Sequence, residues 1–389
     1  MTDVLTYCLN VHPTQTFDDV RAALTGPVRA VKRSISPDRP FPVGLRLSAE
    51  CTAALTEPAL REELAGLLSD GDLRPVTMNG FPYGPFHGTR VKEEVYLPDW
   101  RSEDRVRYST DLADLLAALN PEGAFVSLST VPGAFRPNGA GAEVAMADNI
   151  LRVVAHLVAL ARDTGRRIAL AIEPEPCCFL ETIAETVTFF ETWLFSDAAE
   201  ARLSELADLP RSKAAEALRR HLGLCYDVCH AAVEYEDAAG SIAALRGAGI
   251  PVHKLQLSSA LRIPSGNPAA REALRRFDEP TYLHQLIARG EGGLTRFTDL
   301  GEALAPGGAR DGEEWRVHFH VPVFIDTLPD FATTQDFLRE ILALHRAEPI
   351  SPHLEIETYT WQVLPEGLAA GSVEDAVTRE IEWVREQLS

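Results

Sequence analysis

The sequence is short of basic residues and of paired cysteines. It has 37 Lys and Arg against 57 Asp and Glu in 389 residues, which gives a formal net charge of -20. Such a surplus of negative charge repels polyphosphate, so we expect no binding to nucleic acid. The six cysteines include no Cys-x-x-Cys pair of the kind that holds structural zinc. We therefore expect reduced thiols that are mostly buried.

Long apolar runs are also missing from the sequence. The most apolar stretch, residues 151–160, contains Arg152 and His156, and no run approaches the ~18 apolar residues of a transmembrane helix. The first 13 residues contain Asp3 and neither Lys nor Arg, unlike a signal peptide. We therefore predict a cytoplasmic protein without a transmembrane segment.

What the sequence does contain is a repeated alternation of short apolar runs with longer segments of helical period. Its 46% hydrophobic and 24% charged residues are typical of a globular protein, and its length allows two or three domains or one large barrel. The apolar runs span residues 5–11, 42–47, 74–78, 124–128, 167–172, 222–226, 252–257 and 354–358. Eight strands, each followed by a helix, are what a closed parallel barrel requires. We predict an α/β fold, a (β/α)8 TIM barrel, with residues 1–389 forming a single domain.

Three segments between the strands have features of their own. Residues 79–100 are rich in aromatic residues, Pro and Gly and follow the third strand, so we predict an active-site loop there. Residues 260–314 form an insertion before strand eight, which we expect to be exposed and in part helical, and the β-like run at 316–324 is expected to extend a loop or add an edge strand. Thr182, with Glu185 three residues later, predicts the capped start of a helix, and residues 149–162 predict another helix.

Acidic residues follow three of the predicted strands. The fifth strand ends at Glu173 with Glu175 two residues on, and the sixth ends at Asp227 with His230 three residues on. The eighth strand ends at Glu357. In a βα barrel the carboxyl ends of the strands carry the catalytic groups. Any one of these acids alone could be a solvated turn residue or a helix N-cap, but together they predict a cation site.

The seventh strand contributes an amide instead of an acid. Gln256 lies at its end, and Arg262 follows six residues later, where it would hold an anionic or hydroxylated substrate. His318 and His320 share one face of the β-like run, a spacing that is frequent in metal ligands and also common by chance, so each is a candidate nitrogen ligand. Four donors, together with either histidine, would suit Mn²⁺, Mg²⁺, Zn²⁺ or Fe²⁺. These donors are Glu173, Asp227, Gln256 and Glu357.

The segment at 226–237, YDVCHAAVEYED, resembles a motif of the xylose-isomerase-like barrel superfamily, which includes tagatose and psicose epimerases and repair endonucleases. The resemblance implies that Asp227 is a metal ligand and that His230 contacts the substrate or a second metal. It also implies that Glu173 and Glu357 bind the metal and exchange a proton on opposite faces of the substrate.

The chain departs from the superfamily pattern in two places. The superfamily usually has a histidine where this chain has Gln256, so metal binding would need His318 or His320 to compensate. Residues 127–135, SLSTVPGAF, lack the histidine that the repair enzymes carry after strand four. Together with the negative charge, this second departure argues against a repair nuclease.

A closer resemblance, to the EboE group of bacterial proteins described as metabolite traffic proteins, covers nearly the whole chain. It rests on the phrases TYCLNVHP, NGFPYGPFHGTRVKEEVYLPDW, IEPEPCCFLET, CYDVCH, KLQLSSAL, HFHVPVF and LEIETYTW. The resemblance implies a place in a secondary-metabolite pathway of the Ebo type.

We therefore predict a metal-dependent isomerase or epimerase that acts on a sugar, polyol or cyclitol, free or as its phosphate. One of Glu173 and Glu357 would remove a proton beside a carbonyl and the other would return it, through a metal-stabilised enediolate. The residues expected to bind substrate are His230, Arg262, His87 on the 79–100 loop, and His12 at the end of strand one.

Two other functions remain open. A noncatalytic metabolite-binding or traffic protein on the same barrel would tolerate Gln256 as a weak ligand, although buried acids without a cation are costly. A metal-dependent hydrolase would use a water activated at the same ring of donors.

Overall fold

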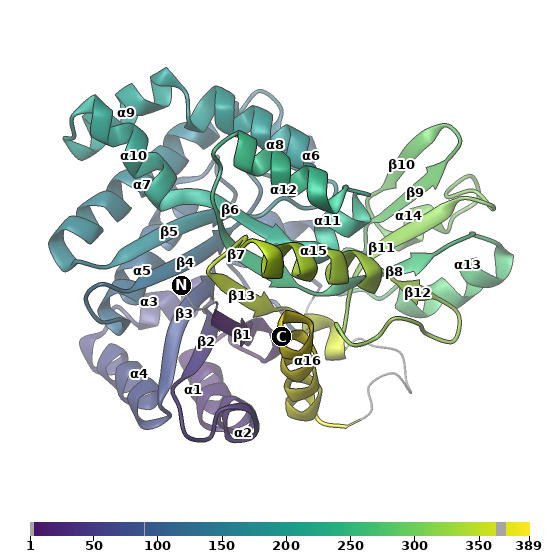
Figure 1. Cartoon of the computed structure of the whole chain (residues 1–389), viewed down its shortest axis with the longest axis horizontal. Helices are drawn as coiled ribbons and strands as arrows, with labels where there is room; N and C mark the ends of the chain where they lie inside the picture. The colour runs from purple at the N-terminus through teal and green to yellow at the C-terminus, as the bar shows by residue number, and fades with distance from the viewer. Residues whose placement is uncertain (1–3, 89, 363–370) are drawn as a thin grey trace.

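The main body of the protein is a closed barrel of parallel strands. The computed structural model describes residues 4–88, 90–362 and 371–389. Its 8-stranded sheet has the order β1-β13-β7-β6-β5-β4-β3-β2, and a parallel bridge between Cys8 and Gly44 joins the two ends. The strands are β1 (Val4–Tyr7), β2 (Phe41–Arg46), β3 (Leu73–Asn79), β4 (Phe125–Thr130), β5 (Arg167–Ile172), β6 (Leu222–Asp227), β7 (Val252–Leu257) and β13 (His353–Ile356). Helices cover the outside (Figure 1), so the predicted (β/α)8 barrel is confirmed.

Most helices lie between consecutive barrel strands and begin where a side chain caps the free backbone N–H groups. Thr182 and Glu185 form the predicted capping box at the start of α8, and the helix predicted at 149–162 lies within α7. The helices are α1 (Phe17–Thr25), α2 (Pro27–Ile35), α3 (Ala49–Ala54), α4 (Pro58–Asp70), α5 (Glu103–Leu119), α6 (Arg136–Gly139), α7 (Glu143–Thr164), α8 (Ile183–Phe189), α9 (Asp197–Ala207), α10 (Arg211–His221), α11 (Val228–Val233), α12 (Ala238–Gly247), α13 (Pro268–Leu274), α14 (Leu300–Ala303), α15 (Gln335–Ala347) and α16 (Val373–Leu388).

Helix α7 is long and apolar enough, by length and composition, to cross a membrane. In the structure it packs against β5 and α5 as one of the helices that cover the barrel. Its residues Ile150, Val154 and Leu157 are fully buried against the sheet. The apolar face of α7 is therefore the face expected of a helix on a parallel sheet, whose strands are covered on both sides.

A second sheet of antiparallel strands stands beside the barrel, on the right of Figure 1. Its order is β10-β9-β11-β8-β12, and the strands are β8 (Ser259–Ile263), β9 (Leu286–Gly290), β10 (Gly293–Phe297), β11 (Glu314–Val321) and β12 (Ala332–Thr333). The segment at 260–314 is in part helical, as expected, since it contains α13 and α14, and its strands β9 and β10 belong to this second sheet. The β-like run is not the predicted edge strand, since β11 is the middle strand of this sheet.

The alternation of residues along β11 explains both its position and its use. Trp315, Val317 and Phe319 are fully buried on one face, in the core of the second sheet. His318 and His320 are buried on the opposite face, which is turned toward the barrel. Pairing with β8 on one side and β9 on the other makes β11 a central strand, and its barrel-facing side carries two histidines to the mouth of the barrel.

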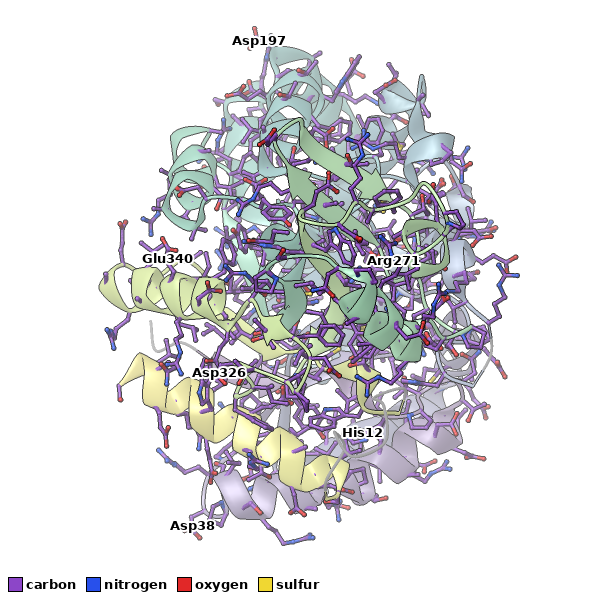
Figure 2. All side chains as sticks on the ribbon, turned by 90° about the vertical axis from the view of Figure 1, so that its right-hand side faces the viewer. His12, Asp38, Asp197, Arg271, Asp326 and Glu340 are labelled. Atoms are coloured by element: carbon purple, nitrogen blue, oxygen red, sulfur yellow. The ribbon has the colours of Figure 1, made fainter. Side chains whose placement is uncertain are left out.

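The six cysteines are all free and buried, as predicted. Much of the acidic surplus is solvated: Asp38, Asp197 and Glu340 are exposed, and they project from the periphery of the molecule in Figure 2. The acids that matter for function are the buried ones at the carboxyl ends of the barrel strands.

Candidate active site

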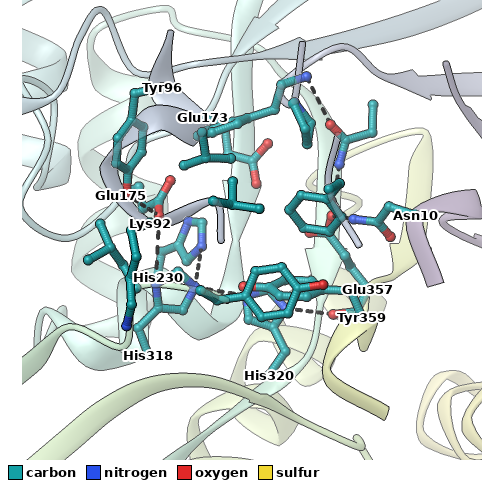
Figure 3. Close-up of a pocket in the computed structure, with 18 residues that line it drawn as sticks. Asn10, Lys92, Tyr96, Glu173, Glu175, His230, His318, His320, Glu357 and Tyr359 are labelled. Atoms are coloured by element: carbon teal, nitrogen blue, oxygen red, sulfur yellow. Dashed lines mark hydrogen bonds and ion pairs between the residues drawn. The ribbon is translucent and has the colours of Figure 1, made fainter. Parts of the chain in front are cut away.

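The pocket at the carboxyl ends of the barrel strands has a polar floor and an aromatic roof. Its cavity volume is ≈ 60 Å³. The roof comes partly from the 79–100 segment, through Phe81, Phe86 and Tyr96, and partly from Tyr282 and Tyr359. The floor is formed by acidic and imidazole side chains from the barrel and from β11 (Figure 3).

Three carboxylates from three different strands converge in this floor. Glu173 follows β5, Asp227 ends β6 and Glu357 follows β13, and one oxygen of each lies within 4.8 Å of the others. We call these residues the carboxylate set. All three are at most 4% exposed. The structure thus brings together the three acids predicted from separate strand ends.

Gln256 stands at the centre of the carboxylate set. Its Nε2 donates to Glu173 Oε1 over 2.8 Å and to Asp227 Oδ2 over 3.3 Å. It also donates to Glu357 Oε2. Gln256 Oε1 and Glu173 Oε2 are buried and have no hydrogen-bond partner among the described residues. Orphaned oxygens beside three acids are a suitable environment for a divalent cation, so the residues present fit one.

Electrostatics in the set also favour a compensating positive charge. Burial, together with repulsion from Glu357 and Asp227, raises the pKa of Glu173 well above its usual range. Burial and the neighbouring Asp227 raise the pKa of Glu357 in the same way. Lys254, which lies deeper in the barrel, lowers both pKa values but does not cancel the shift. A bound cation would relieve the repulsion that raises them.

Asp227 combines the two roles considered for it from sequence. Its Oδ1 accepts from the backbone N–H groups of Cys229 (2.7 Å) and His230 (3.1 Å), and so caps α11. Its Oδ2 faces Gln256 in the carboxylate set. The helix cap therefore fixes the orientation of the oxygen that is free to bind a ligand.

Two asparagines that the sequence reasoning missed hold Glu357 in place. Glu357 Oε1 accepts from Asn10 Nδ2 over 2.5 Å and from Asn79 Nδ2 over 2.8 Å. Asn79 ends β3 and Asn10 lies just after β1. Their position at strand ends was a signal that could have identified them, because polar residues there point into the barrel mouth.

Three imidazoles lie next to the carboxylate set. His318 Nε2 is 3.1 Å from His230 Nε2 and 3.0 Å from His320 Nε2. We call these residues the histidine set. His230 Nε2 is 3.8 Å from Asp227 Oδ2, so the two sets adjoin at Asp227. Burial lowers the pKa of His320 to about 4 and that of His318 well below its usual value, which keeps both rings neutral near pH 7.

Glu175 lines the pocket as well. Its Oε1 accepts from the Tyr96 hydroxyl over 2.7 Å, and it lies 3.7 Å from His318 Nδ1. Burial raises the pKa of its carboxyl despite these partners. The second acid of the fifth strand end is therefore part of the pocket and not a solvated turn residue.

Three of the predicted substrate contacts lie elsewhere. Arg262 does not line the pocket: its guanidinium is 2.7 Å from Asp336, because the chain leaves the barrel after β7 and enters the second sheet. His12 does not line it either, and its Nε2 is 3.0 Å from the Tyr7 hydroxyl. His87 lies behind the roof, where its Nε2 is 2.5 Å from the Asn10 carbonyl oxygen.

Among the residues that the structure describes, none supplies the pocket with a free cationic side chain for a phosphate. Lys92 is the one Lys or Arg that lines the pocket among the described residues. Its Nζ donates to Asp299 Oδ2 over 2.6 Å and to the Glu279 carbonyl oxygen over 3.0 Å. Because this charge is already paired, the pocket favours an uncharged ligand over a phosphate ester.

The fold matches solved structures over nearly its whole length. A xylose isomerase-like TIM-barrel protein from Mycobacterium smegmatis, solved in complex with magnesium, aligns with a TM-score of 0.50 at 13% identity and covers 100% of this chain and 97% of that chain. L-ribulose 3-epimerase aligns with a TM-score of 0.49 at 11% identity, with 100% and 95% covered. The zinc-bound IOLI protein aligns with a TM-score of 0.46 at 12% identity, with 99% and 98% covered.

The chain therefore has the fold of the xylose-isomerase-like TIM barrels, as predicted. At this level of identity the likeness defines the fold and not the reaction. No protein-family model matches the chain, and no curated protein matches it in sequence. The narrower resemblance to the EboE group stays a prediction.

Proposed function

We propose that this protein is a cation-dependent isomerase or epimerase of a sugar, polyol or cyclitol. The observation that carries the proposal is the carboxylate set, in which Glu173, Asp227 and Glu357 are buried together beside orphaned oxygens. Buried carboxylates at this spacing repel one another unless protons or a cation compensate them. The same carboxylates are the groups that a proton-transfer reaction needs.

The chemistry divides between the cation and the chain. A divalent cation bound by the carboxylate set would stabilise negative charge that develops on substrate oxygens. Glu173 would remove the proton from the carbon beside a carbonyl, and Glu357 would return a proton to that carbon. Asn10 and Asn79 would keep Glu357 aimed at the substrate.

The pocket also restricts the substrate. Within the described part of the chain, the paired Lys92 and the distant Arg262 leave no cation for a phosphate, so we expect an uncharged polyhydroxy ketone as the substrate. The aromatic roof would exclude water while the proton is transferred. A place in a secondary-metabolite pathway rests on the resemblance of the chain to EboE proteins alone.

Solvent-hydrogen exchange tests the proposal directly. Mn²⁺-loaded protein would be incubated in D₂O with a panel of ketoses and cyclitol ketones, and deuterium would be located by NMR. We expect deuterium at the carbon beside the carbonyl of at least one compound, and no exchange after chelation. Glu357→Gln should slow exchange by about 100-fold or more, since positioned acid–base groups contribute ~10²–10⁴-fold.

Glu380→Gln is the matched control. Glu380 is a buried acid on α16, and its Oε1 accepts from Thr358 Oγ1 (2.6 Å) and from the Val323 N–H (3.2 Å). A glutamine Oε1 can accept both bonds, so this variant should exchange at the wild-type rate. Full exchange by the Glu357→Gln variant would contradict the role of Glu357. Tight binding of a panel compound without any exchange would contradict the isomerase and favour a metabolite-binding protein.

A further inference from the structure

One buried guanidinium holds both ends of the 79–100 segment that roofs the pocket. Arg105 lies in the first turn of α5 and is fully buried. Its Nη1 donates to the Gly80 carbonyl oxygen over 2.7 Å, and its Nη2 donates to the Phe81 carbonyl oxygen over 3.1 Å. Its Nε donates to the Pro98 carbonyl oxygen over 2.7 Å, at the far end of the segment. The three nitrogens of the guanidinium thus bind three backbone acceptors at once.

The charge of Arg105 depends on these contacts. Among the described residues, no acid forms an ion pair with Arg105, because the nearby Asp99 pairs with Arg101 instead. Burial lowers the pKa of Arg105 to about 10, so the guanidinium stays charged near neutral pH. A buried charge is costly unless hydrogen bonds compensate it. The ends of the roof therefore cannot move away without leaving a buried cation unsatisfied.

A second buried guanidinium binds the next carbonyls of the same segment. Arg46 ends β2, and its Nη2 donates to the carbonyl oxygens of Pro82 (3.1 Å) and Gly84 (2.5 Å). Its Nη1 donates to the Thr14 carbonyl oxygen over 3.3 Å. Together the two guanidiniums bind the carbonyl oxygens of residues 80, 81, 82 and 84. This part of the roof is thus fixed by the barrel before any ligand binds.

The peptide group between Gly80 and Phe81 connects Arg105 to the proposed acid. Its oxygen accepts from Arg105, and its N–H donates to Asn79 Oδ1 over 3.0 Å. That second bond settles the orientation of the Asn79 amide, whose Nδ2 donates to Glu357 Oε1 over 2.8 Å. A continuous hydrogen-bond chain therefore runs from Arg105 through this peptide group and Asn79 to Glu357.

The position of this peptide group leaves no room for adjustment on its other side. The Gly80 N–H donates to the Ser129 carbonyl oxygen of β4 over 3.0 Å. A Cβ atom at residue 80 would lie 2.9 Å from Leu128 Cδ1 and 3.0 Å from the Ser129 oxygen, so the close approach requires glycine. The peptide group is thus held between β4 and the guanidinium on α5.

We propose that Arg105 is a positioning residue for Glu357, acting through the Gly80–Phe81 peptide group and Asn79. Arg105 itself does not line the pocket. Without its guanidinium the peptide group would lose its fixed orientation, and Glu357 Oε1 would be held firmly by Asn10 alone. The role rests on the proposed function, in which Glu357 returns a proton to the substrate.

A double-mutant cycle on solvent-deuterium exchange tests this hydrogen-bond chain. Its variants are Arg105→Met, Asn79→Ala and the two combined. Arg105→Met should slow exchange by about 10²-fold, the size of effect that follows a misplacement near 1 Å. Because both changes act on Glu357 through the same bonds, the double variant should be no slower than the slower single variant. Independent effects would multiply to about 10⁴-fold and would overturn the inference.

Arg166→Met is the matched control. Arg166 precedes β5 at the amino end of the barrel, and its guanidinium also binds backbone carbonyls, those of Asn120 (2.5 Å) and Thr164 (3.0 Å). This variant should exchange at the wild-type rate. If Arg105→Met does not fold, Arg105→Lys replaces it. Lysine keeps the charge but has one nitrogen where three bind, so the same coupling to Asn79→Ala is expected.

Mn²⁺ affinity, measured by EPR, repeats the cycle without any substrate. Since Glu357 belongs to the carboxylate set, Arg105→Met and Asn79→Ala should each weaken Mn²⁺ binding by about 10–100-fold, as loss of an outer-shell partner does, and the double variant no further. An Arg105→Met protein with wild-type affinity and wild-type exchange would overturn the inference. Coupled losses of affinity in a protein that exchanges no deuterium into any compound would contradict the proposed function and leave the positioning of Glu357 intact.

Discussion

Lys254 and Glu355 form an ion pair of 2.5 Å inside the barrel, and both side chains are fully buried. Lys254 lies two residues before Gln256 on β7, and Glu355 lies two residues before Glu357 on β13. Because side chains alternate along a strand, the pair forms the layer below the carboxylate set. Burial alone would lower the pKa of Lys254. The neighbouring Glu355 carboxylate outweighs this effect and raises that pKa above its usual value. Lys254 thus stays protonated beneath the three acids, although the ion pair itself has no net charge.

Replacing Lys254 by Met should therefore be strongly destabilising. It leaves Glu355 as an unpaired buried carboxylate, and breaking such a pair costs about 3–5 kcal/mol. The measurement is the free energy of unfolding in urea at neutral pH. The double variant Lys254→Met with Glu355→Leu should recover much of that loss, because neither charge then remains. A loss below about 1 kcal/mol in the single variant would contradict this account.

Asn79 should matter for the reaction, although its Oδ1 also accepts from the Phe81 backbone N–H over 3.0 Å and so supports the fold. Its Nδ2 donates to Glu357 Oε1, so Asn79→Ala frees one side of the carboxyl that is proposed to return the proton. We expect solvent-deuterium exchange to slow by about 10²-fold, the size of effect that follows a misplacement near 1 Å. Asn120→Ala, which removes a bond to the Leu116 carbonyl at the end of α5, is the control. Equal exchange rates in the two variants would count against the role of Asn79.

Glu380 predicts a dependence of stability on pH. Burial raises the pKa of this carboxyl to about 7, against about 4.3 in an unfolded chain. Because the folded state holds the proton more tightly, the contribution is complete below about pH 4 and is lost as the pH rises through 7. Glu380→Gln cannot ionise, so its free energy of unfolding relative to wild type should increase by about 3 kcal/mol between about pH 4.5 and 8.5. A difference that does not change with pH would contradict the assignment.

A cation in the carboxylate set should stabilise the folded protein. Mg²⁺ prefers oxygen donors, and a free concentration 100 times the dissociation constant adds about 2.7 kcal/mol to the free energy of unfolding. Chelation should remove this gain from wild-type protein, as urea unfolding would measure. Glu173→Gln should gain less from Mg²⁺ at the same concentration. An identical gain in both proteins would place the ion outside the carboxylate set.

The barrel strands and the carboxylate set could be predicted because each depends on local sequence. Short apolar runs mark parallel strands, and their carboxyl ends meet at one edge of a barrel, so Glu173, Asp227 and Glu357 come together wherever eight such strands close. The same reasoning placed the aromatic 79–100 segment over the pocket, where Phe81, Phe86 and Tyr96 now line the roof.

The errors arose where the chain leaves this repeating pattern. Arg262 is only six residues beyond Gln256, but β8 begins at Ser259 and carries it into another sheet. Alternation along β11 showed that His318 and His320 share a face, yet not that the opposite face has a core of its own. Which strand is central depends on partners distant in sequence, and this cannot be derived from a period of two.

The most direct test of the account is anomalous diffraction from crystals of the protein soaked in Mn²⁺. We expect a peak in bonding contact with the oxygens of Glu173, Asp227 and Glu357, with the Gln256 amide turned so that its oxygen faces the ion. The contradicting result is a map from crystals at saturating Mn²⁺ with no anomalous peak beside these carboxylates, in which they still accept hydrogen bonds from Gln256 Nε2. The claim that this pocket works with a cation would then be wrong.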